Sequence, residues 1–391
     1  MTKEEFKDIA PFDDNEVQQV MSTLVKEPGF EHAVRYVMPD VDYDKFCTRL
    51  LQLRTKYEFQ KAAAVPFLDG VLARSTDGIT VSGLDKVEAG KAFTYISNHR
   101  DIVLDAAFLN YLLATRDLPT TEIAIGDNLL VFDWIERLVR LNKSFIVRRG
   151  LKMTQALEAS KHLSAYIRYT ITEKRQSIWI AQREGRAKDS NDVTQESLLK
   201  MLGQLSGDGS LLENIMALNI APLSITYEYD PNDYLKAREF LLRRRDPEFH
   251  KSQRDDLLSM ETGLLGYKGR VHYTFNDCIN SEIERLSGIT DRAEVLHGVR
   301  EAIDRAIHAG YEMFKINYIA YDQLNDTDRF ADQYDFDDIV DFDEYISAQL
   351  DKVEVDGITG EEEIFMREMM LQMYSNPLAN KLIATGEDSE E

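Results

Sequence analysis

The chain has 391 residues, of which 43% are hydrophobic, so it is long enough to bury one large core or two ordinary ones. Its 2 cysteines have no ligand spacing and predict neither a disulfide framework nor a zinc site. The formal net charge of −23 argues against sequence-independent binding of nucleic acid, which needs a basic surface.

The first part of the chain, residues 1–75, has the pattern of helices. Apolar residues recur there at three- and four-residue spacing, within 16–24 and again within 43–53. Gly29 and Pro39 separate these segments. We therefore predict a helical N-terminal region that precedes a different kind of structure.

The middle part, residues 76–285, alternates between short apolar runs and longer helical patterns. The runs that predict strands are 79–82, 93–96, 144–147, 177–181, 220–227 and 270–275, and the helical patterns are 106–113, 154–172 and 234–258. Alternation on this scale predicts an α/β domain in which a mixed sheet is flanked by helices.

The last part, residues 286–391, returns to helical patterns and is rich in Asp and Glu from about residue 322 onward. The acidic cluster 332–338 lacks the glycine of a calcium-binding loop, so we interpret it as solvated surface. We predict a helical acidic C-terminal region whose last residues, 386–391, are frayed.

A histidine follows the second predicted strand and stands out as a candidate general base. His99 lies just after the apolar run, and Asp101 and Asp105 lead into the next helical segment. A carboxylate that holds the imidazole tautomer and stabilises its charged form would complete such a base. Either aspartate could do this, and we favour Asp105, because an acidic residue at the start of a helix also suits the helix dipole.

The letters His-Arg-Asp at residues 99–101 also begin the catalytic loop of protein kinases. That loop needs an asparagine five residues after its aspartate, where this chain has Ala106. An Asp-Phe-Gly motif and a preceding glycine-rich loop are absent from the sequence too. We therefore reject a kinase.

Basic residues follow the strand predicted at 144–147. Arg148 and Arg149 come directly after it, and Lys152 is close by. Guanidinium groups bind phosphate through two parallel hydrogen bonds, so we predict a phosphate site with one of the two arginines as ligand. A second basic run at 243–245, flanked by apolar residues, would either contact anionic lipid headgroups or form ordinary helix surface.

Two further blocks lie at later strands. The strand at 177–181 is followed by Arg183-Glu-Gly-Arg186, in which Gly185 permits a tight turn that brings backbone close to a substrate. Pro222 interrupts the strand at 220–227 and indicates an edge strand, a strand start or a bulge. We expect it to shape the site rather than to take part in chemistry.

Taken in order, these blocks resemble the motifs of the glycerolipid acyltransferases, which acylate glycerol 3-phosphate and lysophosphatidic acid. The similarity extends over roughly residues 76–280, with blocks at 99–105, 144–149, 183–186, 220–225 and 268–272. It implies transfer of a fatty acyl group from acyl-CoA or acyl carrier protein to a hydroxyl of a glycerol phosphate or its lysolipid. Neither a metal nor a cofactor is expected.

The resemblance also implies roles for individual residues. His99 would be the base and Asp105 its partner, while Glu184 would orient the acceptor hydroxyls. Arg148, Arg149 and Arg186 would hold the acceptor phosphate, with Pro222 shaping the site. A lipid product without a spanning helix implies peripheral contact with the membrane, and because the chain has no secretory signal pattern we expect this at the cytoplasmic face.

Two departures from the family pattern bear on these roles. Five residues rather than four separate His99 from Asp105, so either a bulge absorbs one residue or Asp101 is the partner. Arg186 follows Gly185 without the usual spacer, so that Lys188 competes with it for the phosphate. These departures leave two alternatives, an acyltransferase for another lysolipid such as an amino-acid lipid and a non-catalytic lipid-binding member.

Overall fold

A seven-stranded mixed sheet forms the centre of the computed structural model, which describes residues 2–88, 90–204 and 209–389. The strand order is β1-β7-β6-β2-β5-β3-β4, and every neighbouring pair is parallel except β6 with β7. The strands are β1 (Ile79–Ser82), β2 (Thr94–Ser97), β3 (Glu122–Gly126), β4 (Ser144–Val147), β5 (Ile178–Ala181), β6 (Ile220–Tyr227) and β7 (Val271–Phe275). The predicted α/β class, a mixed sheet flanked by helices, is confirmed.

Strand β3 has no counterpart among the predicted strands. Its five residues begin with Glu122 and end with Gly126, and both residue types are uncommon in strands. Glu122 is nevertheless buried, because the hydroxyl of Tyr166 donates to its carboxylate at 2.5 Å and Lys174 pairs with it. Tyr166 and Lys174, which are distant in sequence, thus stabilise Glu122 within β3, a strand that the local sequence pattern does not predict.

The two faces of the sheet carry separate apolar cores. Alternate residues of a strand point to opposite faces, so Tyr95 and Trp179 pack against α5 and α6, while Ile96 and Ile180 pack against α8, α9, α10, α13 and α14. These helices are α5 (Val65–Ser75), α6 (Leu104–Ala114), α8 (Met153–Thr172), α9 (Glu196–Leu202), α10 (Leu211–Met216), α13 (Asn280–Ile283) and α14 (Arg292–Ala309).

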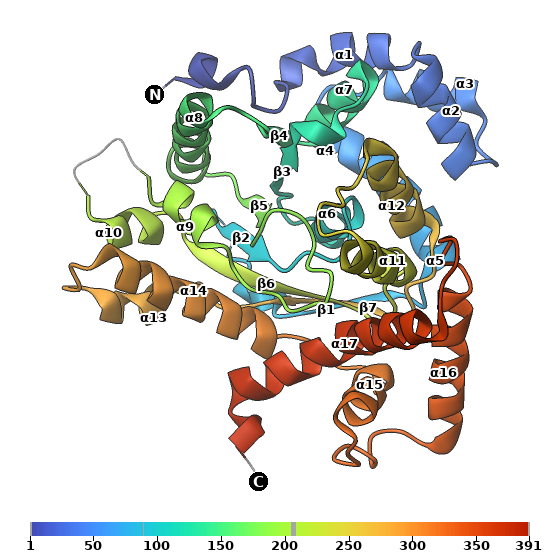
Figure 1. Ribbon diagram of the computed structural model, residues 1–391. Coiled ribbons are helices and arrows are strands. Elements are labelled where there is room, and N and C mark those ends of the chain that lie inside the picture. The colour runs from blue at the N-terminus through green and yellow to red at the C-terminus, as the bar shows by residue number, and fades with distance from the viewer. Residues whose placement is uncertain (1, 89, 205–208, 390–391) are drawn as a thin grey trace.

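The N-terminal helices lie together beyond β3 and β4, at the top of the view in Figure 1. They are α1 (Val17–Leu24), α2 (Pro28–Val37), α3 (Tyr43–Leu50) and α4 (Lys56–Phe59), continued by a π-helical turn, Gln60–Ala64. Their apolar faces share one core with α7 (Asp133–Leu141). The N-terminal region is therefore helical, as predicted, although its boundary near residue 75 stays a prediction.

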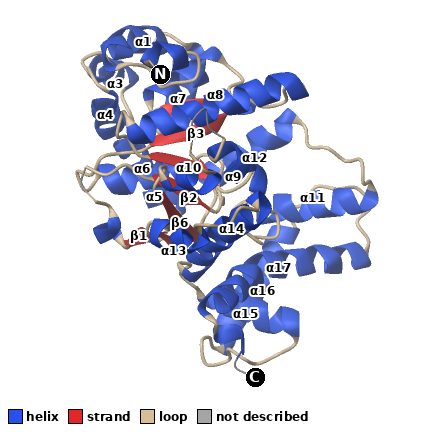
Figure 2. Cartoon of the chain, turned by 90° about the vertical axis from the view of Figure 1, so that its left-hand side faces the viewer, coloured by secondary structure: helices blue, strands red, loops and turns tan. Residues whose placement is uncertain are grey.

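The C-terminal helices occupy the opposite end of the molecule (Figure 2). They are α15 (Lys315–Asn325), α16 (Phe336–Leu350) and α17 (Gly360–Thr385), which share an apolar core with α11 (Asp233–Arg245). A 3-10 turn, Glu387–Ser389, follows α17, and residues 390 and 391 of the predicted frayed end lie outside the described residues. The predicted boundary near residue 285 stays a prediction.

The helical pattern predicted for 234–258 is two helices, because the chain breaks after Arg245 and resumes in α12 (Gln253–Leu265). The three arginines that end α11 have partners within the chain. Arg243 pairs with Glu239, Arg245 pairs with Glu362 of α17, and Arg244 lies over the ring of Phe365. These contacts favour ordinary helix surface over a lipid-binding run. Within the described residues, no helix is both long and apolar enough to cross a membrane.

A buried carboxylate joins α11 to the C-terminal helices. Asp233, at the start of α11, accepts hydrogen bonds from the hydroxyls of Tyr345 and Tyr374, each at 2.7 Å. Burial, opposed by these two hydroxyls and reinforced by the charge of Asp230, raises the pKa of Asp233 to about 7. The group therefore stays protonated in the folded chain at pH values where an unfolded chain releases the proton.

This shift predicts a pH dependence of stability. Between about pH 4 and the folded pKa of about 7, the folded state binds one proton more than the unfolded state. The stabilisation is full below about pH 4 and is lost as the pH rises, by at most about 1.4 kcal/mol per pH unit. Urea denaturation of wild type and Asp233→Asn should show the wild type losing stability relative to the variant over this range. A difference that does not change with pH would contradict the assignment.

Candidate functional site

The parallel strands β2, β5 and β4 deliver the predicted site residues to one edge of the sheet. His99 follows β2, Glu184 follows β5 and Arg149 follows β4, and these strands are separated only by β3. Ligands of open α/β sheets bind outside the carboxyl ends of the strands. The topology thus brings together side chains that are far apart in the sequence.

His99 and Asp105 form a hydrogen-bonded pair at this edge. His99 Nδ1 lies 2.8 Å from Asp105 Oδ2, and the same oxygen accepts the backbone N–H of Arg100 at 2.7 Å. Asp105 is completely buried, and the imidazole packs edge-on against Trp179 with ring centroids 6.0 Å apart. An Nδ1–H that donates to the carboxylate leaves Nε2 as the basic nitrogen.

Asp101 binds backbone N–H groups instead of the imidazole. Its Oδ1 accepts the backbone N–H groups of Val103 at 2.8 Å and Leu104 at 2.7 Å, so it initiates α6. Burial and the charge of Asp105 raise the pKa of Asp101. Of the two aspartates considered from the sequence, Asp105 is the one that contacts the imidazole. The extra residue between His99 and Asp105 belongs to the turn that Asp101 holds.

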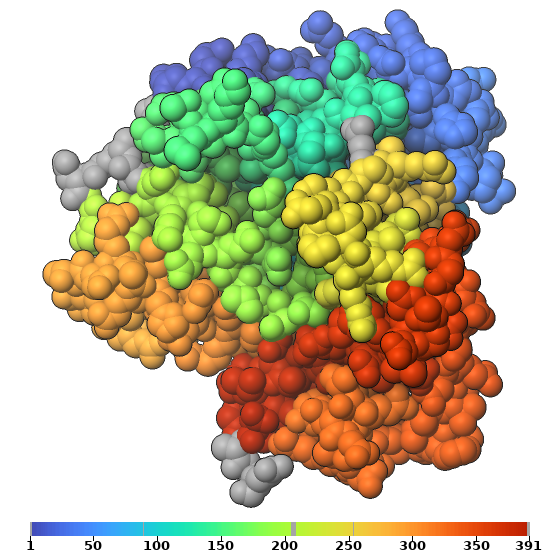
Figure 3. Space-filling model, viewed as in Figure 1, coloured from blue at the N-terminus to red at the C-terminus, as the bar shows by residue number. Residues whose placement is uncertain are grey.

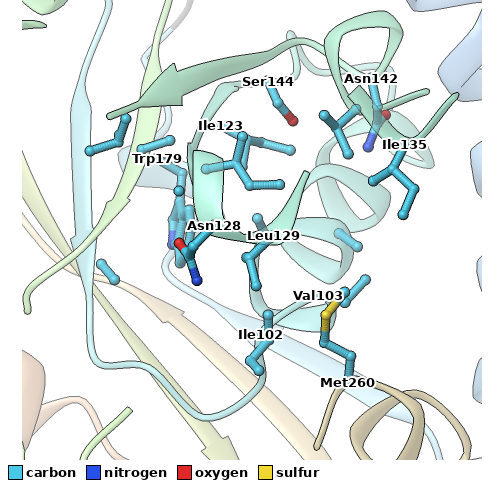
Figure 4. Close-up of a pocket in the computed structure, with 18 of the residues that line it drawn as sticks. Ile102, Val103, Ile123, Asn128, Leu129, Ile135, Asn142, Ser144, Trp179 and Met260 are labelled. Carbon is cyan, nitrogen blue, oxygen red and sulfur yellow. The ribbon is translucent and has the colours of Figure 1, made fainter. Parts of the chain in front are cut away.

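A cavity of about 930 Å³ opens beside His99. One part is apolar and is lined by residues of the N-terminal helices, α6, α7 and α12; Figure 4 shows Ile102, Val103, Leu129, Ile135, Trp179 and Met260 around it. The other part is lined by Arg148, Arg149, Glu184, Gly185, Arg186 and Lys188. The cavity therefore combines an apolar volume with a charged part, and the imidazole lines the same space.

Arg149 reaches the Glu-Gly loop, whereas Arg148 turns toward the N-terminus. Arg149 Nη1 lies 3.4 Å from Glu184 Oε1, and Arg148 Nη2 lies 3.4 Å from Asp8 Oδ2. Gly126, at the end of β3, makes room for this arrangement, because a Cβ there would lie only 2.7 Å from Arg149 Nε. Lys152 precedes α8 and does not line the cavity.

The loop that carries Glu184 turns at Gly185, whose φ of +69° favours glycine. Arg186 is buried, and its Nη1 lies 3.1 Å from the side-chain oxygen of Asn232, in the amide orientation that also lets Asn232 donate to the Ser259 carbonyl. Lys188 Nζ pairs with Glu239 Oε2 at 3.0 Å. Arg186 and Lys188, the two cations considered for the phosphate, therefore both line the cavity. Their partners are Asn232, which precedes α11, and Glu239 within α11.

Pro222 is not part of this group. It is the third residue of β6, where it lies opposite Ile96 of β2 inside the sheet, and it does not line the cavity. Its carbonyl accepts the backbone N–H of Asn276 at 3.0 Å. Of the three positions considered from the sequence, an edge strand is excluded because β6 lies between β7 and β2, and a position near the strand start fits. The geometry gives no support to a substrate contact.

Arg100 belongs to a buried ion pair that local sequence pattern does not reveal. Its Nη2 lies 2.7 Å from Asp192 Oδ2, which also accepts the hydroxyl of Tyr311 at 2.8 Å. The guanidinium lies over the Tyr311 ring, 5.6 Å from its centroid. The pair joins the His99 turn to the loop that follows β5, and Tyr311 joins both to the C-terminal part of the chain.

Hydrogen bonds with α14 and α17 hold the same loop in place. Asp304 of α14 accepts the backbone N–H and the hydroxyl of Thr194 at 2.9 and 2.5 Å. Asn376 of α17 donates to the Asp189 carbonyl at 2.7 Å. The segment between β5 and α9, which carries Glu184 and Lys188, is thus hydrogen-bonded to α14 and α17. The sequence alone does not indicate this role of the two helices.

Comparison with known proteins gives a family for part of the chain. Residues 78–213 match the family model described as Acyltransferase. Among solved structures, the chain is similar to the 1-acyl-sn-glycerophosphate (LPA) acyltransferase PlsC from Thermotoga maritima, with 11% sequence identity and a TM-score of 0.39 over 75% of this chain and 96% of that one. No curated protein sequence matches the chain. Within the described ranges, no group of three or more His, Cys, Asp or Glu side chains could hold a metal ion.

The Arg100–Asp192 pair yields a stability prediction. Asp192→Asn leaves a buried guanidinium without its countercharge, which should lower the free energy of unfolding by ~3–5 kcal/mol. Glu158→Gln breaks an exposed pair with Lys161 and should cost no more than about 0.5 kcal/mol. Urea denaturation of both variants measures the difference, and equal losses would contradict the importance of the buried pair.

Proposed function

We propose that this chain, whose residues 78–213 match the Acyltransferase family model, moves a fatty acyl group from acyl-CoA or acyl carrier protein to a hydroxyl of glycerol 3-phosphate or 1-acylglycerol 3-phosphate. The observation that carries the proposal is the His99–Asp105 pair, whose imidazole lines a cavity that is apolar in one part and cationic in another. The apolar part matches a long acyl chain, and the cationic part matches a phosphorylated acceptor.

The chemistry needs one base and no protein nucleophile. Nε2 of His99 takes the proton of the acceptor hydroxyl while the hydroxyl oxygen attacks the thioester carbonyl. The buried carboxylate of Asp105 stabilises the resulting imidazolium. When the tetrahedral intermediate collapses, the carbon–sulfur bond breaks and the imidazolium returns the proton to the leaving thiolate. The histidine is then neutral again, and the new ester is complete.

The cations beside His99 suit the phosphate of the acceptor. Arg149 and the buried Arg186 present guanidinium groups to the same cavity, and such groups bind phosphate bidentately. Glu184, whose carboxylate lies 3.4 Å from Arg149, accepts hydrogen bonds from acceptor hydroxyls in this proposal. Arg148 is a weaker candidate, because it pairs with Asp8 of the N-terminal segment.

The apolar part of the cavity suits the acyl chain. It is lined by aromatic and aliphatic residues from α2, α3, α5, α7 and the turn Gln60–Ala64, so the N-terminal helices enclose much of it. Burial of each methylene group contributes ~0.8 kcal/mol. The volume available under these helices would therefore set the preferred chain length.

Exposed apolar side chains beside the cavity support peripheral contact with a membrane. Phe132 precedes α7 and is 56% exposed, and Met153 begins α8 and is 88% exposed. Lys152 immediately precedes Met153 and, with Arg148 five residues before Met153, adds positive charge that attracts anionic lipid. We propose that this surface lets a lipid acceptor or product move between the cavity and the bilayer.

The first prediction tests the base. With labelled acyl-CoA and a panel of phosphorylated and lysolipid acceptors, His99→Ala should reduce turnover by ~10² or more, because general base catalysis is lost. Asp105→Asn should also reduce it, since the imidazolium loses its countercharge.

The matched control is His162→Ala, which removes a second histidine paired with a carboxylate, Asp8 at 3.0 Å, outside the cavity. Turnover of this variant should stay near that of the wild type. If the wild-type protein binds lipid but transfers acyl groups to no acceptor, the non-catalytic alternative is correct; transfer to an amino-acid lysolipid alone would support the other alternative.

The second prediction concerns chain length. Ala64 lines the apolar part of the cavity, and Ala64→Phe should shift the preference to shorter acyl chains. The ratio of kcat/KM for a long chain to that for a short one should fall about fourfold for each methylene displaced. Ala62→Phe, in the same π-helical turn but outside the cavity lining, is the control and should leave the ratio unchanged.

A further inference from the structure

Three cations surround one buried carboxylate at the edge of the cavity. Glu239 of α11 is only 3% exposed, and its Oε2 lies 3.0 Å from both Lys188 Nζ and Lys251 Nζ. Arg243 Nη2 lies 3.0 Å from the other oxygen. In the described part of the chain, neither lysine has an ion pair with a second carboxylate. The group thus carries more positive than negative charge.

Two of these cations face the cavity and the third does not. Lys188 and Lys251 line it, whereas Arg243 is 57% exposed and lies outside the lining. The cations that line the cavity are Arg148, Arg149, Arg183, Arg186, Lys188 and Lys251, and the acids are Glu184 and Asp256. In a chain of net charge −23, this local excess of positive charge marks a place for an anion.

This cluster differs from the arginines that follow β4. Lys251 lies between α11 and α12, outside the matched segment 78–213, and Figure 3 shows this yellow part of the chain packed against the green part that contains the β5–α9 loop. Burial, reinforced by the charges of Lys251 and Arg186, lowers the pKa of Lys188 even though Glu239 opposes the shift. An arriving anion would relieve this repulsion.

We propose that Lys188 and Lys251 form a phosphate subsite, in which Glu239 holds the two ammonium groups together until a phosphate enters. The subsite lies near Arg186, whose charge acts on Lys188, and it adds Lys251 of the α11–α12 connection to the cations of the cavity. The ligand is a phosphate monoester, carried either by the acceptor or by a coenzyme A donor. The identification of these sources rests on the proposed function, whereas the subsite itself does not.

The test measures binding without turnover. In the His99→Ala background, titrations with inorganic phosphate, glycerol 3-phosphate and adenosine 3′,5′-bisphosphate give Kd for each. Lys251→Gln should raise Kd for inorganic phosphate about tenfold or more, because a hydrogen bond to a charged group is lost. If the Kd of glycerol 3-phosphate rises by the same factor as that of inorganic phosphate, the phosphate belongs to the acceptor. If the Kd of adenosine 3′,5′-bisphosphate does so, the phosphate belongs to the coenzyme A donor.

Arg243→Gln is the matched control, because it removes a cation from the same carboxylate but not from the cavity. Its Kd values should stay within about twofold of the parent. Equal losses in both variants, an unchanged Kd in Lys251→Gln, or no phosphate binding by the parent would each overturn the subsite. If phosphate binding depends on Lys251 but the wild-type chain, with His99 intact, transfers an acyl group to no acceptor, the proposed function is refuted and the subsite stands.

Discussion

The buried carboxylate of Asp105 is the constraint on which the site depends. A buried carboxylate needs hydrogen-bond donors, and here the imidazole of His99 and the backbone N–H of Arg100 both reach its Oδ2. The backbone carbonyl of Asp105 accepts the hydroxyl of Tyr273 on β7, which fixes the start of α6 against the sheet. The orientation of the His99 imidazole is therefore set by the sheet core and not by the loop alone.

The two helical regions complete the site from opposite sides. The N-terminal helices enclose much of the apolar part of the cavity, and Asp304 of α14, Tyr311 and Asn376 of α17 hold the β5–α9 loop. Segments outside residues 78–213 thus contribute to the cavity wall and to the position of the loop. The sheet places His99, Arg149 and Glu184 at one edge, and the helices outside that range enclose part of the cavity beside them.

Much of the architecture was accessible from pattern, because six of the strands are apolar runs with local signals. β3 was not, since its glutamate is stabilised by Tyr166 and Lys174, which lie far along the chain. The pairing of His99 with Asp105 could be predicted because both residues lie within one turn. Asp192, Glu239 and Lys251 could not, because each acquires its partner only through tertiary packing.

The fastening of the β5–α9 loop has a consequence for biosynthesis. A ribosome releases the chain from its N-terminus, and the early parts of a protein fold first. The loop that carries Glu184 emerges long before α17, yet Asn376 must be present to bind the Asp189 carbonyl. The contact between this loop and α17 can therefore form only after residues 360–385 have been made, later than all seven strands of the sheet.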